Sequence, residues 1–490
     1  MSVETTYITP ITPDTRVLKE GVNRIPISPL SLWPVDTIPS AYVFPSKLDV
    51  TRLKRAIEML SGFYPTIAGR FERDQEGFFF NLTRSPIPFE TQTISSKEAF
   101  PFPDKRVIQE TLDPYLPNLG QEFPLTGANK PLFVIRLTTS SDPEADWSVL
   151  GVSWGHILGD AAACLIALKW LELFYVYGSL EGAVDQKGSL GIPVYGEGIK
   201  LLKVENDEIH FSPPKKNSIP LQEYTYLKGY TIPEGGKLYA KTREGTERVD
   251  LILSLSEVGS LTKSVKDLLL VREEGSYDKN MVLSTQDILT GWFVSLLRRS
   301  GQGIKEVIYV CDFRRFCQSD PAVPPNFADQ VANSAQFRTI SLPDNHNRTN
   351  STSNPFDEIF EIAKTIRKEI INLRSDPYVC FPWLTNVAYH LEKSAKAGLG
   401  QYVIPDEGGL EVNSHIRADW HLDFGFPAYQ TSFHCFDTHI RFLRIYQSNP
   451  TENGEKSLEF ALRVPVESKS GFEELISKDR ASWRSGSDVS

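Results

Sequence analysis

The sequence lacks any excess of positive charge, and this excludes one large class of functions. Its 490 residues include 52 lysines and arginines against 62 aspartates and glutamates, so the formal net charge is −10. A chain of this charge has no general attraction for the phosphate backbone of nucleic acids. Any phosphate-bearing cofactor must therefore meet a local cluster of basic side chains.

Cysteine is scarce, and long apolar stretches are missing. The five cysteines do not have the paired spacing of a disulfide framework, and most lie in apolar runs typical of buried thiols. No apolar stretch reaches the length of a membrane-spanning helix, and residues 1–6 lack the basic and apolar regions of a secretory signal. These absences predict a cytosolic protein with free thiols at Cys164, Cys311, Cys317, Cys380 and Cys435.

Length and pattern predict two domains of mixed α/β structure. The chain is too long for one ordinary hydrophobic core, and its hydrophobic fraction of 40% is that of a globular protein. Between residues 179 and 220 the regular pattern gives way to Gly, Pro, Lys and Glu, which indicates a crossover between domains. We predict a first domain at residues 1–205 and a second at 206–490, each a mixed sheet packed with helices.

Hydrophobic periodicity predicts the elements on both sides of this crossover. Apolar residues at helical spacing indicate helices, and alternating apolar residues indicate strands. Residues 342–354, rich in Asn, Ser and Thr, indicate a surface loop. The predicted helices cover residues 48–60, 161–174, 259–270, 284–297 and 356–373, with a last helix beginning at 472–476. The predicted strands cover residues 70–72, 77–83, 132–139, 147–154, 249–255, 307–311 and 458–464.

One predicted junction between a strand and a helix includes a histidine and a carboxylate. A predicted strand leads into His156, and Asp160 stands directly before a predicted helix. Such junctions present side chains at the edge of a sheet, where a substrate can reach them. The pattern His-x-x-x-Asp is weak by itself, because it occurs again at His415 and Asp419. From the pattern alone, a core histidine and a helix N-cap are the favoured interpretation.

Four other stretches of the sequence favour a functional interpretation of the His-x-x-x-Asp motif. The chain reads Phe-Tyr-Pro-Thr-Ile-Ala-Gly-Arg at 63–70, Ser-Thr-Gln-Asp-Ile-Leu-Thr at 284–290, Asp-Phe-Arg-Arg at 312–315 and Asp-Phe-Gly-Phe-Pro at 423–427. In this order and at this spacing around the His-x-x-x-Asp motif, they resemble the BAHD family of coenzyme A-dependent acyltransferases. The resemblance spans most of the chain.

The resemblance implies a chloramphenicol acetyltransferase-like fold with a solvent channel between the two domains. It also implies that the chain over about residues 428–447 crosses back to the sheet of the first domain, which places Phe433 to Tyr446 with the first half. Asp160 is then expected to point away from His156 and to form a buried bidentate ion pair with Arg314, which is a structural role. A catalytic dyad of Asp160 with His156 is the alternative, because residues four apart share one face of a helix.

The chain departs from the family pattern at three positions. Ala161 replaces the glycine that follows the motif aspartate, and Phe426 and Pro427 replace the tryptophan and glycine of the late motif. These changes resemble the divergent fungal branch of the family more than the plant branch. They do not affect the expected fold, but the substrates of the family cannot be assumed for this chain. The retained part of the late motif is expected to shape the far wall of the channel: Asp423, Phe424 and Gly425.

A single residue can move the proton in both halves of an acyl-transfer reaction. Transfer from a thioester to a hydroxyl needs a base, donors for the developing oxyanion and an acid for the departing thiolate. A neutral imidazole is first base and then acid near pH 7, and no Gly-x-Ser-x-Gly elbow supplies a serine nucleophile. We therefore predict His156 as general base, without a covalent acyl-enzyme.

Two further groups of residues are candidates for binding. The segment 413–415 lies where the family has residues near its catalytic histidine, so Asn413 and His415 are candidate donors to the oxyanion. The best local basic cluster in the second domain is predicted to bind the coenzyme A phosphates, unless it is only a solvated helix face: Lys263, Ser264 and Lys266.

A last cluster would permit metal chemistry. Cys435, Asp437 and His439 alternate along an apparent strand, with His434 adjacent, and this spacing resembles that of zinc ligands. No second Cys/His pair lies nearby in the sequence. We therefore predict that the protein needs no metal.

The predicted function is transfer of an acyl group from acyl-CoA to a hydroxyl of a small specialised metabolite. Acetyl is the acyl group that we predict. The enzyme is predicted to be a monomer without a permanently bound cofactor. Transfer to an amine is one alternative. A carrier-protein-dependent condensation-type enzyme is another, although Gly155 stands where those enzymes usually have a second histidine. A non-catalytic ligand-binding protein on the same fold is the third.

Overall fold

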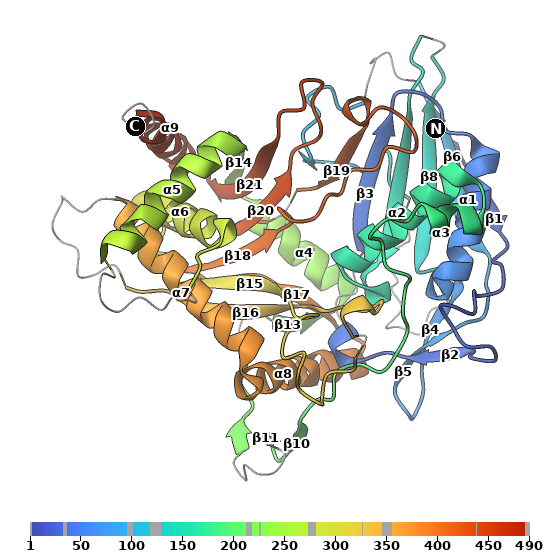
Figure 1. Ribbon diagram of the computed structural model, residues 1–490, viewed down its shortest axis with the longest axis horizontal. Helices are drawn as coiled ribbons and strands as arrows, with labels where there is room; N and C mark the ends of the chain where they lie inside the picture. The colour runs from blue at the N-terminus through green and yellow to red at the C-terminus, as the bar shows by residue number, and fades with distance from the viewer. Residues whose placement is uncertain are drawn as a thin grey trace.

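Two β-sheets lie side by side in the computed structural model of the chain, and helices pack on them (Figure 1). The structure describes residues 2–32, 37–95, 101–117, 129–142, 144–211, 218–224, 227–272, 281–325, 327–344, 355–437 and 439–485. Most of the loop predicted at 342–354 and part of the predicted crossover, residues 212–217, lie outside the described residues.

The first sheet has seven strands in the order β1-β6-β8-β9-β3-β19-β7. β8 and β9 form the predicted hairpin, in which Phe133 lies opposite Trp154. β9 also pairs with β3, and all of its residues are buried. The strands are β1 (Val3–Ile8), β3 (Thr37–Phe44), β6 (Ile87–Ile94), β7 (Ile108–Gln109), β8 (Phe133–Ser140), β9 (Ser148–Gly155) and β19 (Ser432–Phe436).

Helices α1 (Val50–Phe63), α2 (Ala161–Tyr177) and α3 (Leu180–Asp185) lie on this half of the molecule. α1 begins where Asp49 accepts a hydrogen bond from the Arg52 N–H, and it buries Leu53, Ile57 and Leu60 of the apolar residues that predicted it, but not Val50. α2 ends at Gly178, whose φ of 67° is left-handed.

The second sheet has six strands in the order β14-β21-β20-β18-β15-β16. Helices α5, α6, α7 and α9 form a layer on it (Figure 1). α6 begins with a capping box between Ser284 and Asp287, inside one of the motifs found in the sequence. The strands are β14 (Thr246–Ser254), β15 (Glu306–Asp312), β16 (Ala335–Ser341), β18 (Gly409–Ser414), β20 (Phe442–Gln447) and β21 (Ser457–Pro465), and the helices are α5 (Leu255–Arg272), α6 (Thr285–Arg299), α7 (Pro355–Ser375) and α9 (Lys469–Ser485).

The chain crosses back to the first sheet over a shorter segment than predicted. β19 pairs antiparallel with β3 and parallel with β7, so this part of residues 428–447 joins the first sheet. β20 instead pairs with β18 and β21 in the second sheet. The prediction is therefore right for residues 432–436 and wrong for 442–447, because the chain turns back after one strand.

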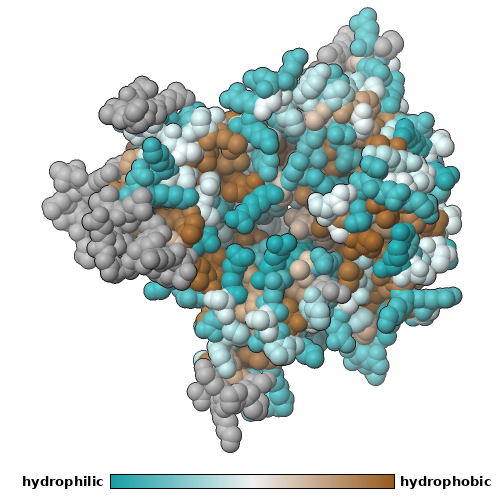
Figure 2. Space-filling view, in the orientation of Figure 1, coloured by the Kyte–Doolittle hydropathy of each residue, from teal (hydrophilic) through white to brown (hydrophobic). Residues whose placement is uncertain are grey.

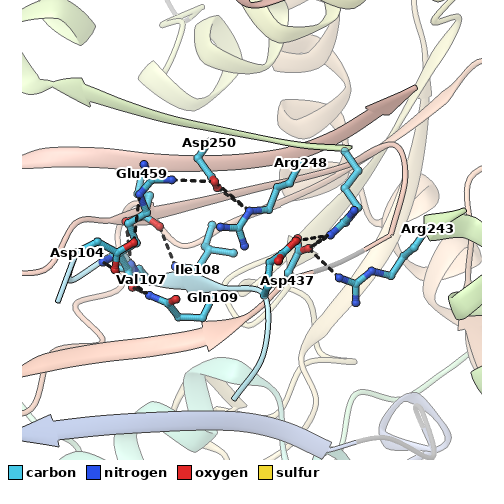
Figure 3. A network of polar contacts seen from close by, with 12 residues as sticks. Asp104, Val107, Ile108, Gln109, Arg243, Arg248, Asp250, Asp437 and Glu459 are labelled. Atoms are coloured by element: carbon cyan, nitrogen blue, oxygen red, sulfur yellow. Dashed lines mark hydrogen bonds and ion pairs between the residues drawn. The ribbon is translucent and has the colours of Figure 1, made fainter. Parts of the chain in front are cut away.

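A buried polar network ties the two sheets together at this crossing (Figure 3). Glu459 of β21 accepts hydrogen bonds from the backbone N–H groups of Val107 and Ile108, both 2.8 Å long, at the start of β7. Asp437, directly after β19, accepts from Arg463 of β21 and from Arg243. Side chains of the second sheet thus bind the backbone of the first.

The predicted crossover contains short elements where no regular structure was expected. α3 and a small sheet of β10, β11 and β12 fall within residues 179–220. The division into domains at residue 205 stays a prediction. The remaining elements are β2 (Arg24–Pro26), β4 (Arg70–Arg73), β5 (Phe78–Asn81), β10 (Lys203–Glu205), β11 (Glu208–His210), β12 (Ser218–Pro220), β13 (Leu227–Tyr230), β17 (Gly400–Val403), α4 (Ile232–Arg243) and α8 (Pro377–Lys396), besides short 3-10 turns.

Two expectations from composition can be compared with this structure. All five cysteines are buried free thiols, as predicted. Of the helices in the described residues, none combines the length and the apolar character needed to cross a membrane.

Candidate active site

A single 3-10 turn, His156–Leu158, connects the end of β9 to the start of α2. Ile157 and Leu158 are buried in the core, whereas His156 is only partly buried. Gly159 closes the turn with a φ of 154°, and a Cβ at this position would lie 2.6 Å from the Cβ of Ala163. The turn therefore holds the His156 ring at the edge of the first sheet, where solvent reaches it.

Asn333, from the second half of the chain, fixes the orientation of the His156 ring. The Asn333 Nδ2 group donates to the backbone carbonyls of His156 at 2.7 Å and of Ser31 at 3.2 Å. This places Oδ1 of Asn333 against Nδ1 of His156, at 3.0 Å. An amide oxygen only accepts, so Nδ1 must carry the proton. Nε2 is then the unprotonated nitrogen, which is the tautomer that a general base needs.

Asp160 receives five hydrogen bonds, and none of them comes from the His156 ring. It caps α2 by accepting from the N–H groups of Ala162 and Ala163, both at 3.1 Å. Both of its oxygens also accept from Arg314, at 2.8 Å each, and Oδ2 accepts from the Ser334 N–H. The predicted bidentate contact is present, and so is the N-cap of the alternative interpretation.

The charge of Asp160 is balanced inside the protein. The side chains of Asp160 and Arg314 are 3% and 10% exposed. Burial alone would raise the pKa of Asp160, but the charge and hydrogen bonds of Arg314, with those of the backbone, hold the pKa below its ordinary value. Asp160 therefore stays ionised and ties the loop that bears His156 to the segment 312–315 of the second half.

His415 lies on the second sheet with one ring nitrogen already occupied. The Trp420 Nε1–H donates to Nδ1 of His415 at 3.2 Å, so Nε2 is the nitrogen that can carry a proton. The ring stacks on Tyr446 with centroids 4.6 Å apart. Burial, with a smaller effect of the Arg444 charge, lowers the pKa of His415 to about 3. His415 is thus a neutral N–H donor, as an oxyanion donor would have to be.

The predicted basic cluster borders a cavity at the second sheet. This cavity has a volume of about 760 Å³ and lies between the starts of α5 and α6 and the end of β18. Lys263, Lys266 and Arg417 line it, and Ser264 does not. The surface is hollowed between the two halves of the molecule beside this region (Figure 2). The lysines of the prediction therefore face a cavity.

The late motif is anchored on the first half of the molecule. Its backbone turns sharply at Phe424, with φ 51°, and at Gly425, with φ 91°. The Phe424 ring packs 5.1 Å from the ring of Phe44. Glu172 of α2 accepts the backbone N–H groups of Asp423 at 2.5 Å and of Phe424 at 3.0 Å. The motif thus holds the chain just before the crossing strand.

The residues spaced like zinc ligands are engaged in other contacts. His434 lies between the Arg106 carbonyl and the Ser432 hydroxyl, and Asp437 pairs with Arg463. His439 lies 3.4 Å from Glu411. No group of three His, Cys, Asp or Glu side chains suited to a metal occurs in the part of the chain that the structure describes.

Two residues of this site were not predicted from the sequence. Asn333 stands in the stretch Gln-Val-Ala-Asn-Ser, which shows no pattern of helix or strand and no motif. Glu172 could have been found, because it is the one carboxylate in a mostly apolar helical run, and a carboxylate in such surroundings needs partners. It supplies the acceptor for the late motif.

The chain is similar to known proteins in structure, and comparisons of its sequence find no match. No family model matches the sequence, and no curated protein matches it. Among solved structures, vinorine synthase is similar with a TM-score of 0.55 at 15% identity, over 96% of each chain. F. graminearum TRI101, in a complex with coenzyme A and deoxynivalenol, is similar with a TM-score of 0.58 at 13% identity, over 92% of this chain and 96% of that one. The X-domain from teicoplanin biosynthesis has a TM-score of 0.52 at 11% identity, over 96% of this chain.

These similarities establish the fold. The chain has the two-sheet, mixed α/β architecture of chloramphenicol acetyltransferase-like acyltransferases, and the expected resemblance is confirmed at that level. Because these three structures are all under 25% identical to the chain, activity has to be argued from the residues of the site.

Proposed function

We propose that the protein is an acyl-CoA-dependent O-acyltransferase that transfers an acetyl group to a hydroxyl of a small specialised metabolite. One observation carries the proposal, namely the hydrogen bond from Nδ1 of His156 to Asn333. It leaves Nε2 as the basic nitrogen of a partly buried imidazole between the two halves. The fold, shared with a transferase solved with coenzyme A, supports this chemistry.

The proposed reaction passes one proton through His156. Nε2 removes the proton of the acceptor hydroxyl as its oxygen attacks the thioester carbonyl, and a tetrahedral oxyanion forms. His415 Nε2–H and the Asn413 amide are the candidate donors to this oxyanion. When the intermediate collapses, the carbon–sulfur bond breaks and the imidazolium returns the proton to the departing thiolate. The products are the ester and free coenzyme A, and no acyl-enzyme is formed.

The co-substrate is proposed to enter through the cavity between α5 and α6. Lys263 and Lys266 supply the local positive charge that an acidic protein needs for the phosphates. Arg417, which the sequence did not single out, adds a third basic side chain next to His415 in the chain. Ser264 lies outside this lining and is a weaker candidate. We propose a cytosolic monomer without a resident metal.

The test is release of free thiol from acetyl-CoA in the presence of a panel of hydroxylated metabolites. His156→Ala should lower kcat by about 10²- to 10⁴-fold, the usual contribution of a general base. Unchanged turnover in the folded variant would contradict the mechanism. An amine panel, run in parallel, separates O-transfer from N-transfer.

Asn333→Ala provides a second test, because it removes the group that fixes the tautomer. Groups that orient a functional histidine contribute on the order of 10- to 100-fold, so kcat should fall by less than in His156→Ala. The control is Asn129→Ala, since Asn129 also accepts from a side chain, that of Arg70, but outside the site. Equal activity of wild type and Asn333→Ala would show that the tautomer does not depend on this contact.

A further inference from the structure

Two histidines of the candidate site are held in opposite tautomers. Nδ1 of His156 donates to the side-chain oxygen of Asn333, which leaves Nε2 of His156 as an acceptor. Nδ1 of His415 instead accepts from the Trp420 Nε1–H at 3.2 Å. Because an indole N–H only donates, the proton of the neutral His415 ring has to be on Nε2. One imidazole is thus arranged to accept a proton and the other to donate a hydrogen bond.

Nε2 of His415 is open to a ligand. Among the described residues it has no protein acceptor, and it is not one of the enclosed side-chain atoms that lack a partner. The next two residues, Ile416 and Arg417, line the cavity proposed for coenzyme A. The charge of Asp160 also acts on the pKa of His415, raising it, although burial outweighs this effect. His415 is therefore close both to that cavity and to the loop that bears His156.

The donor of this hydrogen bond, Trp420, is fixed by its packing. Its indole is 5% exposed and stacks on Phe433 of the crossing strand β19, with ring centroids 5.2 Å apart. The backbone between the two partners is a closed turn, in which the Ala418 N–H donates to the His415 carbonyl at 2.9 Å. The His415 N–H is itself bound to the Ile445 carbonyl at 2.7 Å. The indole N–H therefore keeps its direction toward the imidazole.

The His415 ring is fixed in its plane as well. It stacks on Tyr446 with centroids 4.6 Å apart and an angle of 16° between the planes. A flip of the ring would turn a carbon toward Trp420 and leave the buried indole N–H without an acceptor, which is unfavourable. Stacking thus sets the plane of the imidazole, and the hydrogen bond from Trp420 sets the direction of its free N–H.

We propose that Trp420 is a positioning residue of acyl transfer, which keeps the Nε2–H of His415 directed at the oxyanion of the tetrahedral intermediate. The inference rests on the proposed transferase function and deepens it, because it names the residue that controls one of the two candidate oxyanion donors. Trp420 acts only through the imidazole.

The first test is kinetic and follows thiol release from acetyl-CoA. His415→Phe removes the donor and keeps an aromatic ring against Tyr446, so kcat should fall by about 10²- to 10³-fold, the usual contribution of one oxyanion donor. Trp420→Phe keeps the stacking on Phe433 and removes only the N–H, so kcat should fall less, on the order of 10-fold. KM for acetyl-CoA should stay constant in both, because the oxyanion forms only as the acceptor attacks.

The matched control is Trp383→Phe. Trp383 is 4% exposed, and its Nε1–H donates to the Phe337 carbonyl at 2.9 Å. Its acceptor is thus a backbone group of β16 and not a side chain of the site. This variant should lose stability and keep its kcat. A loss of kcat equal to that of Trp420→Phe would overturn the inference, because any buried indole hydrogen bond would then have the same effect.

A double-mutant cycle separates positioning from structural support. In the His415→Phe background, Trp420→Phe should cost no further activity, because its effect passes through the imidazole. It should also restore stability, since His415→Phe alone leaves the buried indole N–H without an acceptor. Equal losses of kcat in both backgrounds would overturn the inference.

The tautomer can be measured without turnover. Nitrogen NMR of the full chain with isotope-labelled histidine distinguishes protonated from unprotonated ring nitrogens, and the signals of His415 are those that disappear in the double variant. The wild type should have the proton on Nε2 at pH 7, and Trp420→Phe should show both tautomers. A proton on Nδ1 of His415 in an active wild type would overturn the positioning role alone. A proton on Nε2 without thiol release from any acceptor would instead overturn the transferase, and the oxyanion role with it.

Discussion

Asp160 and Glu459 are two of the buried carboxylates that join the halves of this molecule, and they differ in what balances their charge. Asp160, at the loop of the first half, accepts a bidentate pair from Arg314 of the second. Within the described residues, Glu459 of the second sheet accepts hydrogen bonds only from two backbone N–H groups at the start of β7. The pKa of Asp160 is lowered below its ordinary value. Burial, which the two N–H groups only partly offset, raises the pKa of Glu459 to about 7.

The Asp160 contact is therefore independent of pH near neutrality, whereas the Glu459 contact depends on the protonation of its carboxyl group. Asp160 is ionised at every pH near neutrality, so the contact that holds the His156 loop does not change there. Glu459 is neutral in the folded protein below about pH 7, and it becomes a poorly compensated buried anion above it. The contact next to the candidate active site is thus the one protected from titration.

The largest expected effect comes from removing the carboxylate that has an arginine. Asp160→Ala removes the buried partner of Arg314, whose side chain is only 10% exposed, and leaves it the more exposed carboxylate of Asp312 at 3.3 Å. It also removes the cap of α2. Breaking a buried ion pair in this way costs roughly 3–5 kcal/mol. Urea unfolding of wild type and variant should show a loss of this order. A loss below 1 kcal/mol would show that the pair contributes little to joining the halves.

A smaller effect is expected from Asp160→Asn, and its cause can be isolated. Asparagine still caps a helix and accepts one guanidinium hydrogen bond. In the double variant Asp160→Asn/Arg314→Gln no lone buried charge remains, so part of the lost stability and activity should return. Melting temperature and turnover are measured on wild type, both single variants and the double variant. A well-folded, inactive Asp160→Asn that Arg314→Gln does not rescue would instead support the catalytic dyad.

The sequence predicted the contact at Asp160 but not the one at Glu459, and the reason is physical. His156 and Asp160 stand at a recognisable strand-to-helix junction, and the order of five motifs pointed to the fold and to Arg314. Glu459 stands in an ordinary alternating strand, and its partners are backbone groups more than 300 residues away. Backbone donors leave no trace in residue identity.

The same reasoning explains which elements were predicted. Helices α1 and α7 were found because one apolar stripe packs on the core, and α2 and α6 were found from long apolar runs, which are buried on most sides. α8 was missed because Pro382 stands inside it and interrupts the helical pattern. The crossing strand was extended too far, since nothing in residues 437–441 announces the return to the second sheet.

The smallest effect concerns Glu459, and it appears as a dependence on pH. Its folded pKa of about 7 exceeds the ordinary 4.5, so the folded state binds the proton more tightly than the unfolded state. The stability that this contributes is fully present below about pH 4.5 and is lost as pH rises through 7. The loss is at most about 3 kcal/mol, from the difference between the two pKa values.

Glu459→Gln should remove this dependence, because an amide does not titrate. The variant loses one acceptor for the two N–H groups, so at pH 5 it should be less stable than wild type by about 1–2 kcal/mol. Between pH 5 and 8 that difference should disappear and then reverse, since only the wild type acquires a buried charge and loses about 2–3 kcal/mol over this range. Urea unfolding at four pH values measures it, and Asp160→Asn is the control, whose difference from wild type should stay constant over the same range. If the Glu459→Gln difference also stayed constant, a folded-state pKa of Glu459 within this pH range would be contradicted, and the contacts of Asp160 and Glu459 would not differ in their response to pH.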